Sequence, residues 1–181
     1  MSTPITLYGS DILKRKTTRV GEITPELRQL ALDMVDTMHE ANGVGLAAPQ
    51  ISRSERMCVI DVPADAEDAQ FAKSNAEAVA MPLVMFNPDI TKTEGSVRRS
   101  EGCLSFPDVF VSITRPAVVT VEYTDIEGAR RTITVQGLLA RAVLHEVDHL
   151  EGVTLVDRMS QPQRMVNARR LKRIREEAEL Q

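Results

Sequence analysis

The sequence of 181 residues contains no tryptophan, and aromatic residues make up only 3% of it. The core must therefore be built from leucine, valine, isoleucine, methionine and alanine. No stretch reaches the roughly 18 apolar residues that a membrane-spanning helix needs, so we expect no membrane partner. The net charge of −4 argues against overall electrostatic attraction to DNA.

Only two cysteines occur, which is too few for a disulfide framework. The first residues also lack the basic and apolar regions of a secretory signal. We therefore expect a cytoplasmic protein, in whose reducing surroundings free thiols persist and can bind metal. The length fits a single domain spanning residues 1–181.

A helix is predicted to begin at Thr24, which can cap it, with Pro25 and Glu26 in its first turn. Apolar residues then recur at helical spacing until Asn42 and Gly43 end the pattern. His39 lies off the apolar series, so a solvated or capping role is expected for it rather than metal binding.

Several short runs rich in β-forming residues predict strands. Residues 57–62 form one, with Cys58 as a small core residue, and residues 83–87 form another that Pro88 should stop. Residues 118–123 and 131–135 alternate as a hairpin around a turn at 125–128. The segment 63–82, rich in alanine and acidic residues, predicts an extended loop or a short exposed helix.

Gly137 opens a long helical segment that should end near Gly152, and a basic C-terminal helix is expected over residues 160–181. Strands precede helices without regular alternation. The sequence therefore favours an α+β fold with mostly antiparallel sheets around a central helix, flanked by one helix near the N-terminus and one at the C-terminus.

That central helix contains His145 and His149, whose spacing of four places both imidazoles on one face, one turn apart. Glu146 projects beside the same face, where it can handle a proton without being a ligand. Two exposed histidines at this spacing by coincidence are the alternative. Because two of only three histidines fall here, we interpret the segment as a metal-binding motif.

A catalytic metal centre usually has three protein ligands and one open position. The best third ligand is Cys103, since Gly102 lets the backbone come close and a nearby metal would hold the sulfur as thiolate. A further segment, residues 43–50, contains two glycines that permit close packing of backbone against a ligand or a strand. Considered alone, it is a tight turn that ends a helix.

These three segments together resemble the peptide deformylase family. The motifs are Gly-Val-Gly-Leu-Ala-Ala-Pro-Gln at 43–50, Glu-Gly-Cys-Leu-Ser at 101–105 and His-Glu-Val-Asp-His-Leu at 145–150. The resemblance extends to the predicted strand near residue 83, the hairpin and the basic terminal helix, and so covers most of the chain.

The resemblance implies a metal-dependent hydrolase that removes the formyl group from the N-terminal formylmethionine of newly made polypeptides. It implies that Cys103, His145 and His149 hold one divalent ion, typically Fe2+, with Zn2+, Ni2+ or Co2+ as possible substitutes. Ligand types alone would equally suggest zinc. Water on the metal would attack the formyl carbon while Glu146 acts as general base and acid. The family pattern also implies that Gln50 and the backbone N–H of Leu104 meet the developing oxyanion.

By the same resemblance, the substrate contacts are Val44, Gly45, Gly102, Leu138 and Arg141. Val44, Leu138 and the aliphatic part of Arg141 would form an apolar pocket for the methionine side chain. Arg141 could equally be a solvated residue of its helix.

Glu101 and Asp148 are expected to orient the metal ligands or to pair with an arginine such as Arg115. Surface ion pairs are the alternative for both. One departure from the family concerns Phe110, which stands where some relatives carry a basic residue that contacts the peptide.

The basic terminal helix resembles one that can dock on the ribosome in this family, although an amphipathic helix with a solvated charged face is the alternative. Two other functions stay open at this stage. A zinc endopeptidase would need a third ligand after the helix, and only a carboxylate such as Asp157 is available there. A non-catalytic, ribosome-associated binding module is the second.

Overall fold

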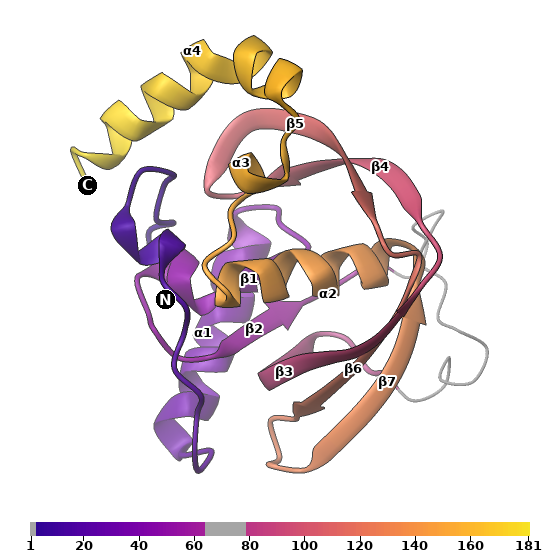
Figure 1. Ribbon diagram of the computed structural model, residues 1–181. Helices are drawn as coiled ribbons and strands as arrows, with labels where there is room; N and C mark the ends of the chain where they lie inside the picture. The colour runs from indigo at the N-terminus through magenta and orange to yellow at the C-terminus, as the bar shows by residue number, and fades with distance from the viewer. Residues whose placement is uncertain (1–2, 64–78) are drawn as a thin grey trace.

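The computed structural model describes residues 3–63 and 79–181 of the chain (Figure 1). Most of the segment 63–82 therefore lies outside the described residues. The helical elements are η1 (Asp11–Lys14), α1 (Pro25–Glu40), η2 (Ala48–Ile51), α2 (Gly137–Leu150), α3 (Leu155–Arg158) and α4 (Gln161–Ala178). The strands are β1 (Gly45–Ala47), β2 (Met57–Ile60), β3 (Leu83–Glu94), β4 (Val97–Cys103), β5 (Phe106–Arg115), β6 (Val118–Thr124) and β7 (Arg130–Gln136).

Two antiparallel sheets surround α2. Strands β1, β2, β3, β6 and β7 form the first sheet, in that order, and β4 pairs with β5 in the second. Figure 1 shows α2 lying between the five-stranded sheet and the β4–β5 pair, with α1 packed on the other side of the first sheet. The expected α+β architecture with a central helix is confirmed.

The alternation of side chains along β2 explains why the sheet can carry helices on both faces. Cys58 and Ile60 pack against α2, whereas Met57 and Val59 pack against α1. All four side chains are fully buried. Burial raises the pKa of the Cys58 thiol well above its ordinary value, so Cys58 is the inert core residue that the sequence predicts.

A third apolar cluster holds the second sheet to the end of the chain. Val109, Val111 and Ile113 of β5 pack against Leu171 and Ile174 of α4. Ser160 caps α4 by accepting a hydrogen bond from the Gln163 N–H, and the Gln163 side chain accepts one from the Ser160 N–H. None of the helices in residues 3–63 and 79–181 is both long and apolar enough to cross a membrane.

The prediction that Pro88 stops the strand beginning at Leu83 is wrong. β3 continues to Glu94 because Asn87 adopts a left-handed conformation, with φ of 51°, and the ladder to β6 shifts register between Phe86 and Asp89. Pro88 lies in that irregularity, where a residue without an N–H is tolerated. The Asn87 side chain makes two hydrogen bonds of 2.7 Å to the backbone of Val20.

The other predicted elements agree with the structure to within three residues at each end. They comprise α1, β2, the β6–β7 hairpin, α2 and α4. The sequence reasoning did not identify β1, β4, β5 or α3 as regular elements. His39 lies half exposed at the end of α1 and hydrogen-bonds Asp61 over 2.8 Å, in keeping with the non-metal role expected for it.

Candidate metal centre and active site

Cys103, His145 and His149 converge on one point. One ligand atom from each lies within 4.8 Å of those of the other two. Cys103 ends β4, whereas the two histidines come from successive turns of α2. Their rings stand edge to face, with centroids 5.0 Å apart, because residues four apart on a helix lie almost above one another. The Cys103 Sγ lies 3.3 Å from His149 Nε2.

Carboxylates on the neighbouring elements hold this cluster in place. His145 Nδ1 lies 3.3 Å from Glu101 Oε2. Glu101 in turn accepts two hydrogen bonds from Arg115, over 2.6 and 2.9 Å, and Arg115 donates a third to Asp148 over 2.9 Å. Arg158 donates to both carboxylate oxygens of Asp148. Glu101 therefore contacts His145 directly, whereas Asp148 reaches the cluster only through Arg115.

Burial alone would raise the pKa of Glu101, but the hydrogen bonds from His145 and Arg115 outweigh it and lower that pKa to about 2. Glu101 is thus ionised whenever the protein is folded near neutral pH. Burial and the neighbouring His145 lower the pKa of His149, which leaves its imidazole neutral and able to donate a lone pair to a metal.

Glu146 is buried, with 3% of its surface exposed, and burial raises the pKa of its carboxyl group to about 7. Within the described residues, its Oε2 has no hydrogen-bond partner. A buried carboxylate oxygen without a partner is costly, so its presence beside a ligand cluster indicates a functional group. The same side chain packs directly against Gly45 of β1, where any Cβ atom would collide with Oε1.

Gln50 is almost fully buried, and its side-chain amide points toward the cluster. Its Nε2 lies 3.5 Å from Cys103 Sγ and donates to Ser105 Oγ over 3.2 Å, while its Oε1 accepts from the Ala47 N–H over 2.9 Å. Sequence reasoning did not single out Ser105, although it belongs to the motif at 101–105. Arg158 was also missed, because only the turn into α3 brings it back to Asp148.

A cleft of about 620 Å³ opens onto these side chains. Every residue that the sequence predicts to contact substrate or oxyanion lines it, namely Val44, Gly45, Gln50, Gly102, Leu104, Leu138 and Arg141. Gly43 also lines it, and a Cβ atom there would approach Leu104 Cδ1 to 2.7 Å. The glycines of the motif at 43–50 therefore let this segment pack closely against Leu104 and Glu146.

Asp157, the alternative third ligand, is engaged elsewhere. Its carboxylate accepts hydrogen bonds from the N–H and the hydroxyl of Thr154, over 2.7 and 2.9 Å, and so caps α3. The ligand set in the structure contains Cys103 instead. The geometry thus removes the support for a peptidase-type ligand set.

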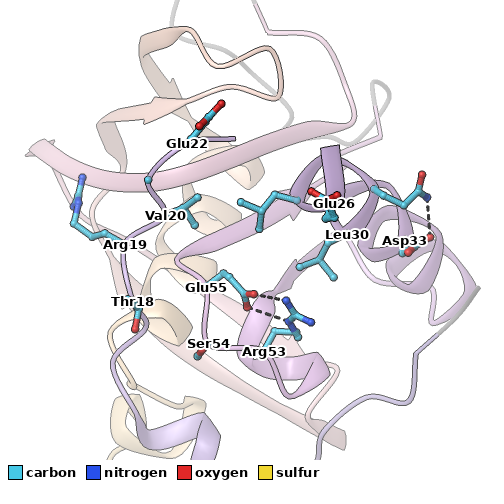
Figure 2. Close-up of a pocket in the computed structure, with 13 residues that line it drawn as sticks. Thr18, Arg19, Val20, Glu22, Glu26, Leu30, Asp33, Arg53, Ser54 and Glu55 are labelled. Carbon is cyan, nitrogen blue, oxygen red and sulfur yellow. Dashed lines mark hydrogen bonds and ion pairs between the residues drawn. The ribbon is translucent and has the colours of Figure 1, made fainter. Parts of the chain in front are cut away.

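A second hollow, shown in Figure 2, lies between residues 18–22, the first turns of α1 and residues 53–55. It has a volume of about 730 Å³. Charged side chains line it, and two of them, Arg53 and Glu55, pair with each other across its edge. Neither histidine nor cysteine lines this hollow, and among the described residues the Cys-His-His cluster belongs to the first cleft.

The residues of the first cleft fit a divalent metal ion. One thiolate and two imidazoles form a ligand set that zinc and iron both accept. Three protein ligands leave a position open, and the unpartnered Oε2 of Glu146 is available to a group bound there.

Comparison with known proteins agrees with this site. The family model described as polypeptide deformylase matches residues 2–165. A peptide deformylase from Thermus thermophilus is 41% identical over 165 residues, which cover 91% of this chain and 85% of that protein. The crystal structure of a peptide deformylase from Ehrlichia chaffeensis covers 100% of both chains, with a TM-score of 0.87 and 32% identity. Its structure in complex with actinonin covers 98% of both chains, with a TM-score of 0.85 and 31% identity.

The similarity extends over nearly the whole chain and is not limited to short motifs. It includes the strand that carries Cys103 and the helix that carries His145 and His149. Sequence, fold and site therefore point to the same enzyme class. The chain belongs to the peptide deformylase family, and it is a hydrolase that removes an N-formyl group.

Proposed function

We propose that this hydrolase acts on the N-terminal formylmethionine of newly made polypeptides and releases formate. One observation carries the proposal. The buried Oε2 of Glu146, which has no partner among the described residues, belongs to a side chain that lines the same cleft as Cys103 and His145. A carboxyl group with a pKa near 7 is suited to accept and return a proton at neutral pH.

In the proposed reaction, Cys103, His145 and His149 hold one divalent ion. When bound, this ion supplies Lewis acidity and lowers the pKa of a water molecule in its open position. Fe2+ is the proposed native ion, with Zn2+, Ni2+ or Co2+ as substitutes. The Glu101 carboxylate orients the His145 imidazole, and Asp148 supports Glu101 through their shared partner Arg115.

Glu146 takes a proton from the attacking water as its oxygen bonds to the formyl carbon. The formyl oxygen gains negative charge, and the amide N–H of Gln50 and the backbone N–H of Leu104 donate to it. The carbon–nitrogen bond then breaks. Glu146 passes its proton to the departing amine, so the products are formate and a peptide with a free N-terminal methionine.

The methionine side chain occupies the apolar part of the cleft. Val44, which is 38% exposed, and Leu138 supply apolar surface there, and the stem of Arg141 covers one side. β1 is an edge strand of its sheet, so the peptide backbone can add to it as a further strand.

Formate release from a formyl-Met peptide tests this function. The protein is prepared anaerobically with Fe2+, and formate is followed against a Glu146→Ala variant with the same metal content. We expect formate only from the wild type. No formate above the variant's level would overturn the proposal. Cleavage of internal peptide bonds would support a peptidase, and retained metal without either reaction would support a binding module.

We further propose that residues 1–181 act as one domain in the cytoplasm, where newly made chains emerge. The α4 helix is the proposed ribosome-docking segment. Its outer face carries exposed apolar residues, Met165 at 72% and Val166 at 84%, among exposed arginines. Cosedimentation of the protein with ribosomes, at low and at high salt, tests the docking.

A further inference from the structure

Phe110 has no part in the proposed reaction, yet it lies beside the metal-binding cysteine. Its side chain is 71% exposed, and its ring rests on Gly102, where a Cβ atom would come within 2.7 Å of Phe110 Cε1. An aromatic ring held so openly at the edge of a catalytic cleft is available to a bound molecule.

The backbone around Phe110 is irregular, and this irregularity sets the position of the ring. Asp108 has a left-handed conformation, with φ of 59°. The pairing of β4 with β5 passes from Glu101↔Val111 to Cys103↔Phe106, so residues 107–110 of β5 face Gly102 alone. Such conformations persist where the surrounding structure holds them, often at binding sites.

A groove of about 930 Å³ borders the catalytic cleft at this point. Asp108 and Phe110 line both hollows, which makes the groove a continuation of the cleft. Its other wall is the outer face of α4, with Arg169, Arg170, Lys172, Arg173 and Glu176. A peptide whose N-terminus reaches the metal centre can therefore leave the cleft along α4.

The groove is positively charged. Four basic side chains line it, against the carboxylates of Asp108 and Glu176. Arg170 is engaged in holding α4 to β5, because its Nη1 donates to the Asp108 carbonyl over 2.7 Å. Within residues 3–63 and 79–181, no carboxylate forms an ion pair with Arg169. Arg173 forms an ion pair with Glu177, 3.8 Å away on the exposed surface of the same helix.

We propose that this groove is a second binding site for the substrate peptide and that it selects acidic residues. Phe110 packs against the residues that follow the methionine, and Arg169 and Arg173 pair with an acidic side chain further along. The inference rests on the proposed deformylase function, which it extends to the rest of the peptide. Because these contacts are distant from the reacting bond, they lower KM and leave kcat nearly unchanged.

Formyl-Met peptides of one length, with Glu, Ala or Lys placed at successive positions after the methionine, test this proposal. At one or two of these positions and at low salt, we expect KM for the Glu peptide to be about three- to tenfold below that for the Lys peptide. A factor of this size corresponds to the free energy of one or two exposed ion pairs. The difference in KM between the Glu and Lys peptides should shrink at about 0.5 M salt, because salt at that concentration screens exposed charges.

The double variant Arg169→Ala/Arg173→Ala should abolish the difference. Arg164→Ala removes one positive charge from the same helix outside the groove, and should preserve the difference. Equal KM values for the three peptides, or a preference that survives in the double variant, would overturn this inference while formate release still supports the proposed function. No formate from any peptide would overturn both.

Discussion

Glu146 of α2 and Gly45 of β1 pack so closely that a Cβ atom on residue 45 would collide with Glu146 Oε1. The contact joins two of the three sequence motifs, at residues 43–50 and 145–150. It explains why the third position of the first motif, Gly45, carries no side chain. It also fixes the position of a group that has to meet a water molecule to within a fraction of an ångström.

Gly45→Ala should therefore impair the reaction without removing the metal ligands. The new methyl group must push the carboxylate or β1 aside, and a misplacement of about 1 Å lowers kcat about 100-fold. Formate release and metal content, measured on the same preparation, check this expectation.

Gly21→Ala is the matched control, because a Cβ atom at Gly21 meets nothing within 4 Å. It should keep wild-type kcat. Equal kcat for Gly45→Ala and the wild type would show that the Glu146 position is not restricted by β1.

Arg115→Ala should strongly destabilise the fold. Arg115 is buried and is the main partner of the Glu101 carboxylate, so its removal leaves a buried charge poorly compensated, at a cost of about 3–5 kcal/mol. Denaturant unfolding of the metal-free protein measures the loss.

Arg131→Ala is the control for Arg115→Ala. It removes the ion pair between Arg131 and Asp125, in which the arginine side chain is 56% exposed. That change should cost far less than Arg115→Ala, because solvent screens an exposed ion pair. Similar losses for the two variants would contradict a structural role for the buried network of Glu101, Arg115 and Asp148.

The two cysteines should behave oppositely toward metal. A chelator should lower the melting temperature of the wild type, because a ligand present at 100 times its Kd stabilises by about 2.7 kcal/mol. Cys103→Ala should melt at the same temperature with and without chelator, and should retain little metal by elemental analysis.

Cys58→Ala should be less stable than the wild type, since it leaves a small cavity in a fully buried position. It should nevertheless keep both the metal and the chelator effect. Loss of metal from this variant, or full retention by Cys103→Ala, would argue against the assigned ligands.

Gly152→Ala should destabilise the protein more than Gly128→Ala. Both glycines have positive φ, 75° and 89°, so both substitutions carry a backbone cost of roughly 1 kcal/mol. Only at Gly152 would the Cβ atom also collide, lying 2.6 Å from the Lys14 carbonyl oxygen. That overlap should add about 1–3 kcal/mol in denaturant unfolding. Equal losses of stability in the two variants would mean that η1 moves to make room for the new methyl group.

The elements that the sequence predicted correctly are those whose signals are local. The start of α1 depends on Thr24, whose hydroxyl accepts from the Leu27 N–H three residues later. The metal-binding face of α2 depends on residues four apart. The β6–β7 hairpin depends on a turn in which the Asp125 side chain accepts from two backbone N–H groups. Each of these signals lies within a few residues.

The errors concern residues whose conformation depends on distant partners. Asn87 carries β3 past its expected end because its side chain bonds Val20, 67 residues away. β5 was missed because the left-handed Asp108 interrupts the alternation of buried and exposed residues at its start. Ser105 and Arg158 join the site through Gln50 and Asp148, and nothing near them in sequence indicates those partners.

The separation in sequence of Cys103 and His149, which is 46 residues, governs when the metal site can form during synthesis. The β4–β5 and β6–β7 pairs are local hairpins, which form early because little chain entropy is lost in closing them. A growing chain that ends before His145 contains a single ligand, Cys103, and cannot bind a metal ion stably. Metal capture is thus coupled to the arrival of α2, and a chain truncated before this helix should be recovered without metal.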